Sequence, residues 1–106
     1  MKMRESFLEK KFAEAIKKTG SLPLKFTSPG TAGVPDRIVL IPGGRILFVE
    51  LKKPGEKLRP LQEKRKKDLE SMGFTVEIVD SIQRIEEVCH EIRTAQLPSV
   101  CHSESD

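Results

Sequence analysis

The sequence predicts an α/β domain in which a mixed central sheet carries helices on both faces. Two neighbouring segments, residues 36–41 and 45–52, are apolar on both faces of the strands they would form, which is typical of central strands covered on each side. A helical segment over residues 59–72 separates the second of them from another strand at 74–79. Such a connection implies a parallel crossover. Together these observations indicate helices packed against a sheet of mixed direction.

The chain begins with an amphipathic helix over residues 5–18. Four of its apolar side chains fall in one arc of the helical wheel: Leu8, Phe12, Ala15 and Ile16. Gly20 ends this helix. Residues 22–27 can form a short strand, in which Pro23 favours an edge or an end. Residues 28–35 are rich in Pro and Gly and predict a loop.

The second half of the chain continues the alternation of strand and helix. Pro60 lies in the first turn of the helix over residues 59–72, and Gly73 ends it. Asp80 is expected to cap a last helix that runs to about residue 93, with Gln83 placed as in a capping box. Residues 1–93 are expected to form a single domain, and residues 94–106 a flexible C-terminal tail.

Composition adds a strong charge asymmetry. The 106 residues carry a net charge of +3, but residues 51–67 hold eight Lys or Arg against two Asp or Glu, and residues 68–106 hold two against nine. The first two-thirds of the chain can therefore face a polyanion, whereas the last third cannot. A solvated, Lys-rich helix face is the alternative explanation of the basic stretch.

Other classes of protein are disfavoured. No stretch approaches the roughly 18 to 20 apolar residues of a membrane span, and the charged N-terminus lacks the apolar core of a secretory signal. A soluble intracellular protein with no membrane association is expected. Cys89-His90 and Cys101-His102 suggest zinc, but their spacing fits none of the usual paired cysteine forms. A core or surface thiol is the preferred interpretation.

Charged residues interrupt the two central strands at Asp36, Glu50 and Lys52. Glu50 and Lys52 are two apart on a strand, so they share a face. A two-residue Gly43-Gly44 turn would pair Asp36 with Leu51 on the opposite face. A three-residue loop over 42–44 would pair Asp36 with Glu50 instead. We predict the three-residue loop, because it gathers the charges around one ion.

Two carboxylates at one sheet edge, with no His or Cys nearby, suit a hard cation such as Mg²⁺ or Mn²⁺. Such an ion polarises a phosphate and lowers the pKa of a bound water, while a neighbouring Lys positions the nucleophile or stabilises negative charge. The set is suited to phosphodiester hydrolysis. A buried carboxylate–lysine salt bridge at a strand end is the alternative that spacing alone leaves open.

Three ordered motifs resemble the PD-(D/E)xK nuclease signature: Gly33-Val34-Pro35-Asp36-Arg37, Phe48-Val49-Glu50-Leu51-Lys52, and Leu61-Gln62. More narrowly, the chain is similar to the VRR-NUC group (virus-type replication-repair nucleases), above all to its small stand-alone members of phage type. The resemblance spans roughly residues 5–85. It implies a restriction-endonuclease-like αβββαβ core and divalent-metal-dependent cleavage of DNA, in a bacterial or phage-infected cytoplasm.

The resemblance also implies roles for individual residues. Asp36 and Glu50 would be metal ligands, joined by the backbone carbonyl of Leu51, and Lys52 would be the catalytic lysine. Gln62 resembles the family's supporting glutamine. An acidic residue on the first helix is matched by Glu9 or Glu5. Glu9 is preferred because it lies at the edge of the buried arc, whereas Glu5 falls inside it.

The expected DNA surface combines six basic residues around this site: Lys25, Arg37, Lys53, Lys57, Arg59 and Lys64. With no Trp or Tyr and five Phe, the chain has little material for base stacking, so backbone and shape recognition should dominate. A domain of this size covers about 10 base pairs. Cutting two strands therefore suggests two copies of the chain. The resemblance to small stand-alone family members implies a homodimer acting on branched DNA such as four-way junctions or flaps, and no organic cofactor is expected.

Three alternatives remain at this point. The chain could be a non-catalytic DNA-binding module that retains the nuclease fold. It could be a metal-dependent enzyme of another class, such as a small phosphatase. It could also be a partner protein whose acidic last helix binds a basic surface.

Overall fold

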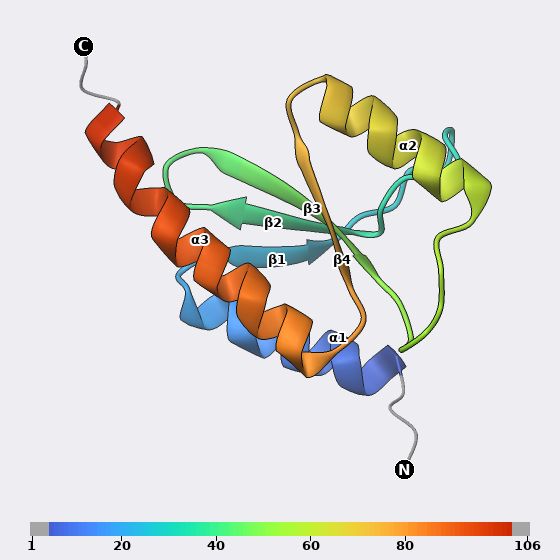
Figure 1. Ribbon diagram of the computed structural model, residues 1–106, viewed down its shortest axis with the longest axis horizontal. Coiled ribbons are helices and arrows are strands. Elements are labelled where there is room, and N and C mark those ends of the chain that lie inside the picture. Colours follow the sequence, from blue (N-terminus) through green and yellow to red (C-terminus); the bar gives the residue numbers. More distant parts are fainter. Residues whose placement is uncertain (1–4, 103–106) are drawn as a thin grey trace.

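The computed structural model describes residues 5–102, and the side chains of residues 6–95. Its elements follow the predicted order (Figure 1): α1 (Glu5–Lys18), β1 (Leu22–Lys25), β2 (Arg37–Ile41), β3 (Arg45–Leu51), α2 (Pro60–Ser71), β4 (Thr75–Val79) and α3 (Ile82–His102). The boundaries lie within two residues of the predicted ones, except at the end of α3.

The four strands form one mixed sheet in the order β1-β2-β3-β4. β1 pairs with β2, and β2 with β3, in antiparallel fashion, while β3 and β4 are parallel. The parallel pair is connected through α2, which confirms the predicted crossover. The mixed sheet flanked by helices is therefore confirmed.

The hairpin between β2 and β3 has the predicted three-residue loop. Ile41 pairs with Arg45 and Arg37 with Val49, so residues 42–44 form the turn. Gly43 and Gly44 have φ of 97° and 82°, a region that costs a residue with a Cβ roughly 1–2 kcal/mol. Continued by one residue, this register places Asp36 opposite Glu50.

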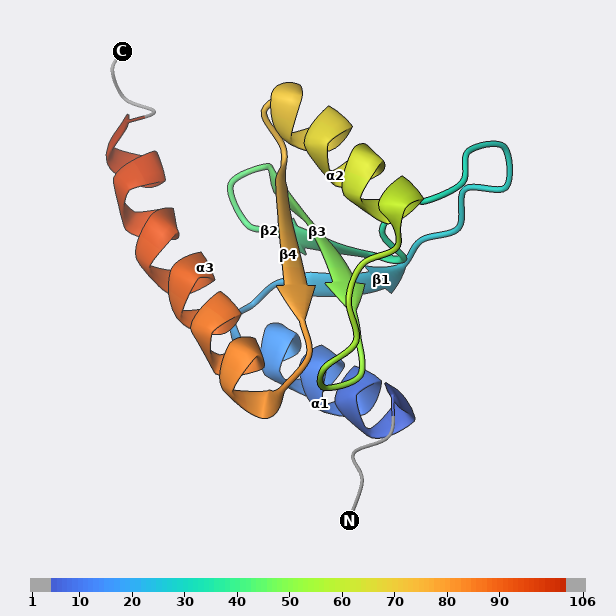
Figure 2. The same ribbon diagram turned by 45° about the vertical axis from the view of Figure 1, so that its right-hand side comes forward.

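One face of the sheet forms the hydrophobic core with α1 and α3 (Figures 1 and 2). Val39 and Val49 from the central strands are fully buried, and they belong to one cluster with Phe12 and Ile16 of α1 and Val88 of α3. The apolar arc predicted for the first helix is therefore its core face. Cys89 also lies in this cluster as a free thiol, whose pKa is raised by burial.

The opposite face is covered less than predicted. α2 packs along β4 and has no buried residue, because its sequence is mostly charged. It leaves the β1 and β2 side of this face open. Leu22, Leu24, Leu40 and Ile46 are 38–50% exposed there, as is Phe74 at 38%. The expectation that both central strands are covered on each side is therefore wrong for this part of the sheet.

The last helix differs from its prediction at both ends. Ser81 caps it rather than Asp80, since the Ser81 hydroxyl accepts a hydrogen bond from the Arg84 N–H at 3.1 Å. The helix runs on to His102 instead of ending near residue 93, and it continues past Pro98. Residues 103–106 of the predicted tail lie outside the described residues. No helix in the described part of the chain is long and apolar enough to cross a bilayer.

Candidate active site

Glu50 and Lys52 lie at the carboxyl end of β3, on the face that α2 covers. Alternation along β3 sends Leu47, Val49 and Leu51 into the core and Glu50 to the other side. Glu50 and Lys52 are 8% and 6% exposed, and the Lys52 ammonium lies 3.9 Å from Oε2 of Glu50. The Lys52 N–H donates to the Val79 carbonyl at 2.9 Å, so pairing with β4 fixes its backbone.

Gln62 connects the first turn of α2 to Glu50. Its Nε2 donates a hydrogen bond to Oε2 of Glu50 at 3.2 Å, and its Oε1 accepts one from the Arg59 N–H at 2.9 Å. The second bond caps the helix start and orients the amide so that its N–H₂ group faces the carboxylate. The structure thus brings the predicted Gln62 to the predicted Glu50.

Asp36 lies just before β2, opposite Glu50 in the strand register. Its backbone carbonyl accepts a hydrogen bond from the Phe26 N–H at 2.8 Å. Its Oδ1 is buried and has no hydrogen-bond partner among the described residues. A buried carboxylate oxygen without a donor is costly, and a cation removes that cost. This oxygen is the observation that fits a metal at the Asp36–Glu50 end of the sheet.

The described residues contain no cluster of three or more His, Cys, Asp or Glu that could hold a metal. Asp36 and Glu50 would have to share an ion with backbone and solvent oxygens. Mg²⁺ tolerates such a set, since it is often bound through one or two carboxylates and keeps several waters.

Comparison with known proteins identifies the family of this chain. A family model described as the VRR-NUC domain matches residues 1–83. The chain belongs to the VRR-NUC domain family. A phage protein named "Putative nuclease p44", from Acyrthosiphon pisum secondary endosymbiont phage 1, is 44% identical over 79 residues, which cover 74% of this chain and 85% of that protein. A solved structure described as a VRR_NUC domain superposes with a TM-score of 0.76 at 29% identity, over 81% of this chain and 94% of that one.

These matches confirm the resemblance seen in the sequence and make this chain a nuclease domain with the VRR-NUC fold. The roles of its individual residues remain predictions. The ordered motifs around Asp36, Glu50 and Gln62 all lie within the matched residues.

Within the VRR-NUC domain, Glu9 lies on the core side of the sheet rather than beside Glu50. Its Oε2 forms an ion pair with Arg37 at 2.9 Å, and Arg37 pairs with Val49 in the sheet register. The Arg37 side chain is 12% exposed, and its Nε is buried without a hydrogen-bond partner among the described residues. Arg37 is therefore occupied with Glu9 rather than free for DNA. The side chain of Glu5 lies outside the described residues.

The other predicted DNA-binding residues are on the surface. Lys53, Lys57, Arg59 and Lys64 are exposed along the loop and the start of α2. Lys25 is exposed too, but it pairs with Arg37 in the register and so belongs to the α1 side of the sheet. The basic surface next to Glu50 is therefore the loop and helix that follow it.

Two features of the site were not predicted from sequence. Gly33 lies directly against Leu61 of α2, and the Arg65 side chain donates to the Ala32 carbonyl at 2.9 Å. A glycine in a loop signals a turn as readily as a close contact. Arg65 lies within four consecutive basic residues. Nothing in the sequence of this run shows which of the four side chains contacts the loop of the same chain rather than solvent.

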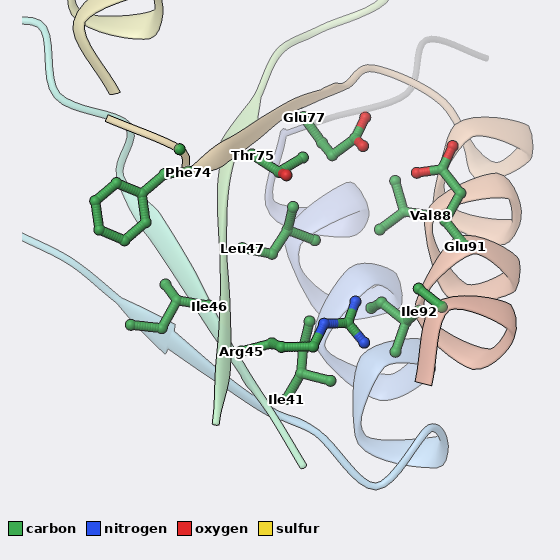
Figure 3. A pocket seen from close by; sticks show the side chains of 12 residues that line it. Ile41, Arg45, Ile46, Leu47, Phe74, Thr75, Glu77, Val88, Glu91 and Ile92 are labelled. Carbon is green, nitrogen blue, oxygen red and sulfur yellow. The ribbon is translucent and has the colours of Figure 1, made fainter. Parts of the chain in front are cut away.

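A cavity of about 470 Å³ lies away from this site, between the start of β3, β4 and α3 (Figure 3). Arg45 points into it beside Ile92, and Glu77 and Glu91 lie at its other side. Burial, together with the neighbouring Glu91, raises the pKa of the Glu77 carboxyl to about 7, although Arg84 and Lys66 oppose the shift. Arg45 begins β3 and Glu50 nearly ends it, so the cavity is not part of the candidate active site.

Proposed function

We propose that this VRR-NUC domain is a divalent-metal-dependent DNA endonuclease with Asp36, Glu50 and Lys52 as its catalytic centre. The proposal is carried by the buried Asp36 oxygen, which has no hydrogen-bond partner among the described residues, opposite the buried Glu50–Lys52 pair. Charged groups in such a place are costly unless they bind a cation or each other. Asp36 lies just before β2 and the Glu50–Lys52 pair at the end of β3, next to each other in the sheet. This position supports a shared role in one catalytic site.

Asp36 and Glu50 would hold the ion together with the backbone carbonyl of Leu51. Mg²⁺ or Mn²⁺ suits this set of oxygen ligands. When bound, the ion supplies polarisation of the scissile phosphate and a lower pKa for a coordinated water. No organic cofactor is required for this hydrolysis.

The protein's own side chains supply positioning and charge. The Lys52 ammonium, 3.9 Å from Glu50, orients the attacking water or stabilises negative charge on the phosphate. Gln62 holds Glu50 through its hydrogen bond. Glu9 holds Arg37, which adjoins Asp36 in the chain; a direct catalytic role for Glu9 stays a prediction.

The basic residues beside Glu50 support a DNA substrate that is held through its phosphates. Lys53, Lys57, Arg59 and Lys64 are exposed on the α2 side of the site, where they can bind backbone oxygens. The chain has no Trp or Tyr for a stacking platform. The protein would therefore select its substrate by the shape of the DNA, and we propose branched DNA, such as junctions or flaps, as that substrate. The proposed location is the cytoplasm of a bacterial or phage-infected cell.

The open part of the sheet supports a homodimer. Leu22, Leu24, Leu40, Ile46 and Phe74, hereafter the open apolar face, are each 38–50% exposed, and exposed apolar patches of this kind often mark interaction sites. Phosphates do not bind such a surface, whereas two copies can pack it sheet against sheet. A stable interface buries roughly 800 Å² per partner, so the proposed dimer would also cover residues around the open apolar face.

The decisive experiment is cleavage of four-way-junction, flap and linear duplex DNA in Mg²⁺ or Mn²⁺. We expect the wild-type protein to cut the branched substrates, and Asp36→Asn and Lys52→Ala to lose at least about a hundredfold in rate. Lys10→Ala removes an exposed lysine of α1 and should cleave like wild type.

Equal cleavage by the wild type and both site variants would refute the catalytic centre. Binding to DNA without cleavage under any condition would favour a non-catalytic binding module. Preferential cleavage of linear duplex would keep the nuclease and remove the selectivity for branched DNA.

A further inference from the structure

The loop that leads into Asp36 lies directly against the first turn of α2. Figure 2 shows this loop, between β1 and β2, projecting beside the start of the helix. A Cβ built on Gly33 would lie 2.6 Å from the Leu61 carbonyl oxygen and 2.9 Å from Leu61 Cγ. Gly33 also has φ of 83°. Only glycine therefore allows the loop and the helix to approach this closely.

Arg65, one helical turn further along α2, binds the same loop. Its Nε–H donates to the Ala32 carbonyl at 2.9 Å, while its NH1 group donates to the Asp68 carboxylate at 3.0 Å. Asp68 thus holds the guanidinium in the orientation that reaches the loop. The backbone of the loop is fixed to the helix at two consecutive residues, Ala32 and Gly33.

These contacts matter because α2 has little else to hold its first turn. The helix has no buried residue, yet Gln62 in that turn donates to Glu50. The loop ends at Asp36, whose backbone carbonyl accepts a hydrogen bond from the Phe26 N–H at the start of the loop. A shift between loop and helix would therefore move Asp36 and Gln62 relative to Glu50.

We propose that Gly33 and Arg65 are positioning residues of the active site. Their contacts with Leu61 and Ala32, hereafter the loop–helix latch, hold Asp36 and Gln62 in place around Glu50. The proposal rests on the proposed function in one respect, that Asp36 and Glu50 bind the metal. The proposal distinguishes Arg65 from its basic neighbours. Lys64 and Lys67 are exposed to solvent, whereas the Arg65 side chain binds the Ala32 carbonyl of the same protein.

Gly33→Ala tests the close contact. Restoring ordinary contact at 3.4 Å requires the loop and Leu61 to separate by most of an ångström, and a displacement of that size at an active site costs roughly 10- to 100-fold in kcat. We expect that loss, with KM for DNA changed by less than about threefold. In metal-free protein titrated calorimetrically with Mn²⁺, we expect affinity to fall about tenfold.

Two glycines provide matched controls. Gly20 has nearly the same φ, 84°, and apart from its two neighbours no described residue comes within 4 Å of a Cβ placed there. Gly20→Ala therefore introduces the same backbone strain without a steric clash. Gly30 lies in the same loop and also has open space. Both variants should keep wild-type kcat and Mn²⁺ affinity. If Gly33→Ala matches them within about twofold in both measurements, the latch is refuted.

Arg65 gives an independent test should Gly33→Ala fail to fold. Arg65→Ala should lower kcat and Mn²⁺ affinity, and Arg65→Lys should recover part of both because it keeps a donor for the Ala32 carbonyl. Lys64→Ala, which loses only a DNA contact, should raise KM and leave Mn²⁺ affinity unchanged. If Arg65→Ala behaves like Lys64→Ala, Arg65 is a DNA contact and the proposal fails.

Asp36→Asn distinguishes this proposal from the proposed function. If Asp36→Asn abolishes Mn²⁺ binding while Gly33→Ala and Arg65→Ala preserve it, the metal site stands and the latch fails. If Asp36→Asn itself leaves Mn²⁺ binding unchanged, the proposed metal site fails, and the latch as a device for that site fails with it.

Discussion

The Gln62 amide donates to Oε2 of Glu50 at 3.2 Å and accepts the Arg59 N–H at 2.9 Å. One side chain therefore caps a helix and holds a buried carboxylate of the adjacent strand. The bond from the Arg59 N–H to Oε1 fixes which way the amide points, so that its N–H₂ group faces Glu50 as a donor. The start of α2 is thereby tied to the candidate active site.

Gln62→Ala is expected to lower kcat about tenfold while leaving the fold intact, because Glu50 loses an orienting donor and α2 has no buried residue to lose. Steady-state kinetics and a thermal melt measure the two effects. Gln83→Ala, which removes an exposed glutamine of α3, is the control. A Gln62→Ala enzyme with unchanged kcat would contradict a supporting role.

Replacing Lys57, Arg59 and Lys64 together by Ala should weaken DNA binding and flatten its salt dependence. Each lost phosphate contact reduces the slope of log K against log salt by about 0.9 for duplex DNA. Fluorescence anisotropy between 50 and 200 mM salt measures the slope. A matched triple variant of Lys10, Lys17 and Lys18, exposed on α1, should keep it. Equal slopes in both triple variants would place the DNA surface elsewhere.

Leu40→Glu should disrupt the proposed homodimer, because it places a charge in the middle of the open apolar face, where Leu40 is 38% exposed. Sedimentation velocity of wild type and variant measures the effect. Phe7→Glu is the control, since Phe7 is 47% exposed on α1 and should leave the dimer intact. A wild-type protein that sediments as a monomer, with and without DNA, would refute dimerisation.

Glu77 should make the protein less stable as pH rises. Its folded pKa of about 7 lies above the ordinary value of 4.5, so the folded state binds the proton more tightly than the unfolded state. The free energy of unfolding should fall between about pH 4.5 and 7, by at most about 3 kcal/mol, and by less because solvent screens this partly exposed carboxyl. Urea denaturation at several pH values measures this dependence.

Glu77→Gln should flatten that pH dependence, because the amide does not titrate. Glu87→Gln is its control, because Glu77 and Glu87 both form ion pairs with Arg84 but the Glu87 side chain is half exposed. A slope that persists in Glu77→Gln would assign the effect to another group.

Ile16→Ala should cost about 2–5 kcal/mol of the free energy of unfolding, since Ile16 is fully buried in the core cluster. Phe7→Ala on the same helix should cost less than about 1 kcal/mol, because that ring is 47% exposed. Denaturant titration of both variants tests which face of α1 holds the fold. Equal losses would contradict the observed orientation of the helix.

Much of the fold was predictable because it follows from local pattern. The spacing of Leu8, Phe12 and Ile16 specifies a helix and its buried face, and the three-residue turn at 42–44 sets the register that brings Asp36 opposite Glu50. The end of α3 and its cap at Ser81 were not predictable with the same accuracy, because helix ends depend on weak and competing signals.

The sequence alone determined the order of elements, the family, and the residues Asp36, Glu50, Lys52 and Gln62 as a candidate set, since hydrophobic periodicity and motif spacing are encoded locally. Tertiary structure decided the rest. It paired Glu9 with Arg37 on the core side of the sheet, left the open apolar face uncovered, and placed Gly33 against Leu61. Those relationships join residues far apart in the chain, and their distances depend on how helices pack on the sheet, which no local pattern records.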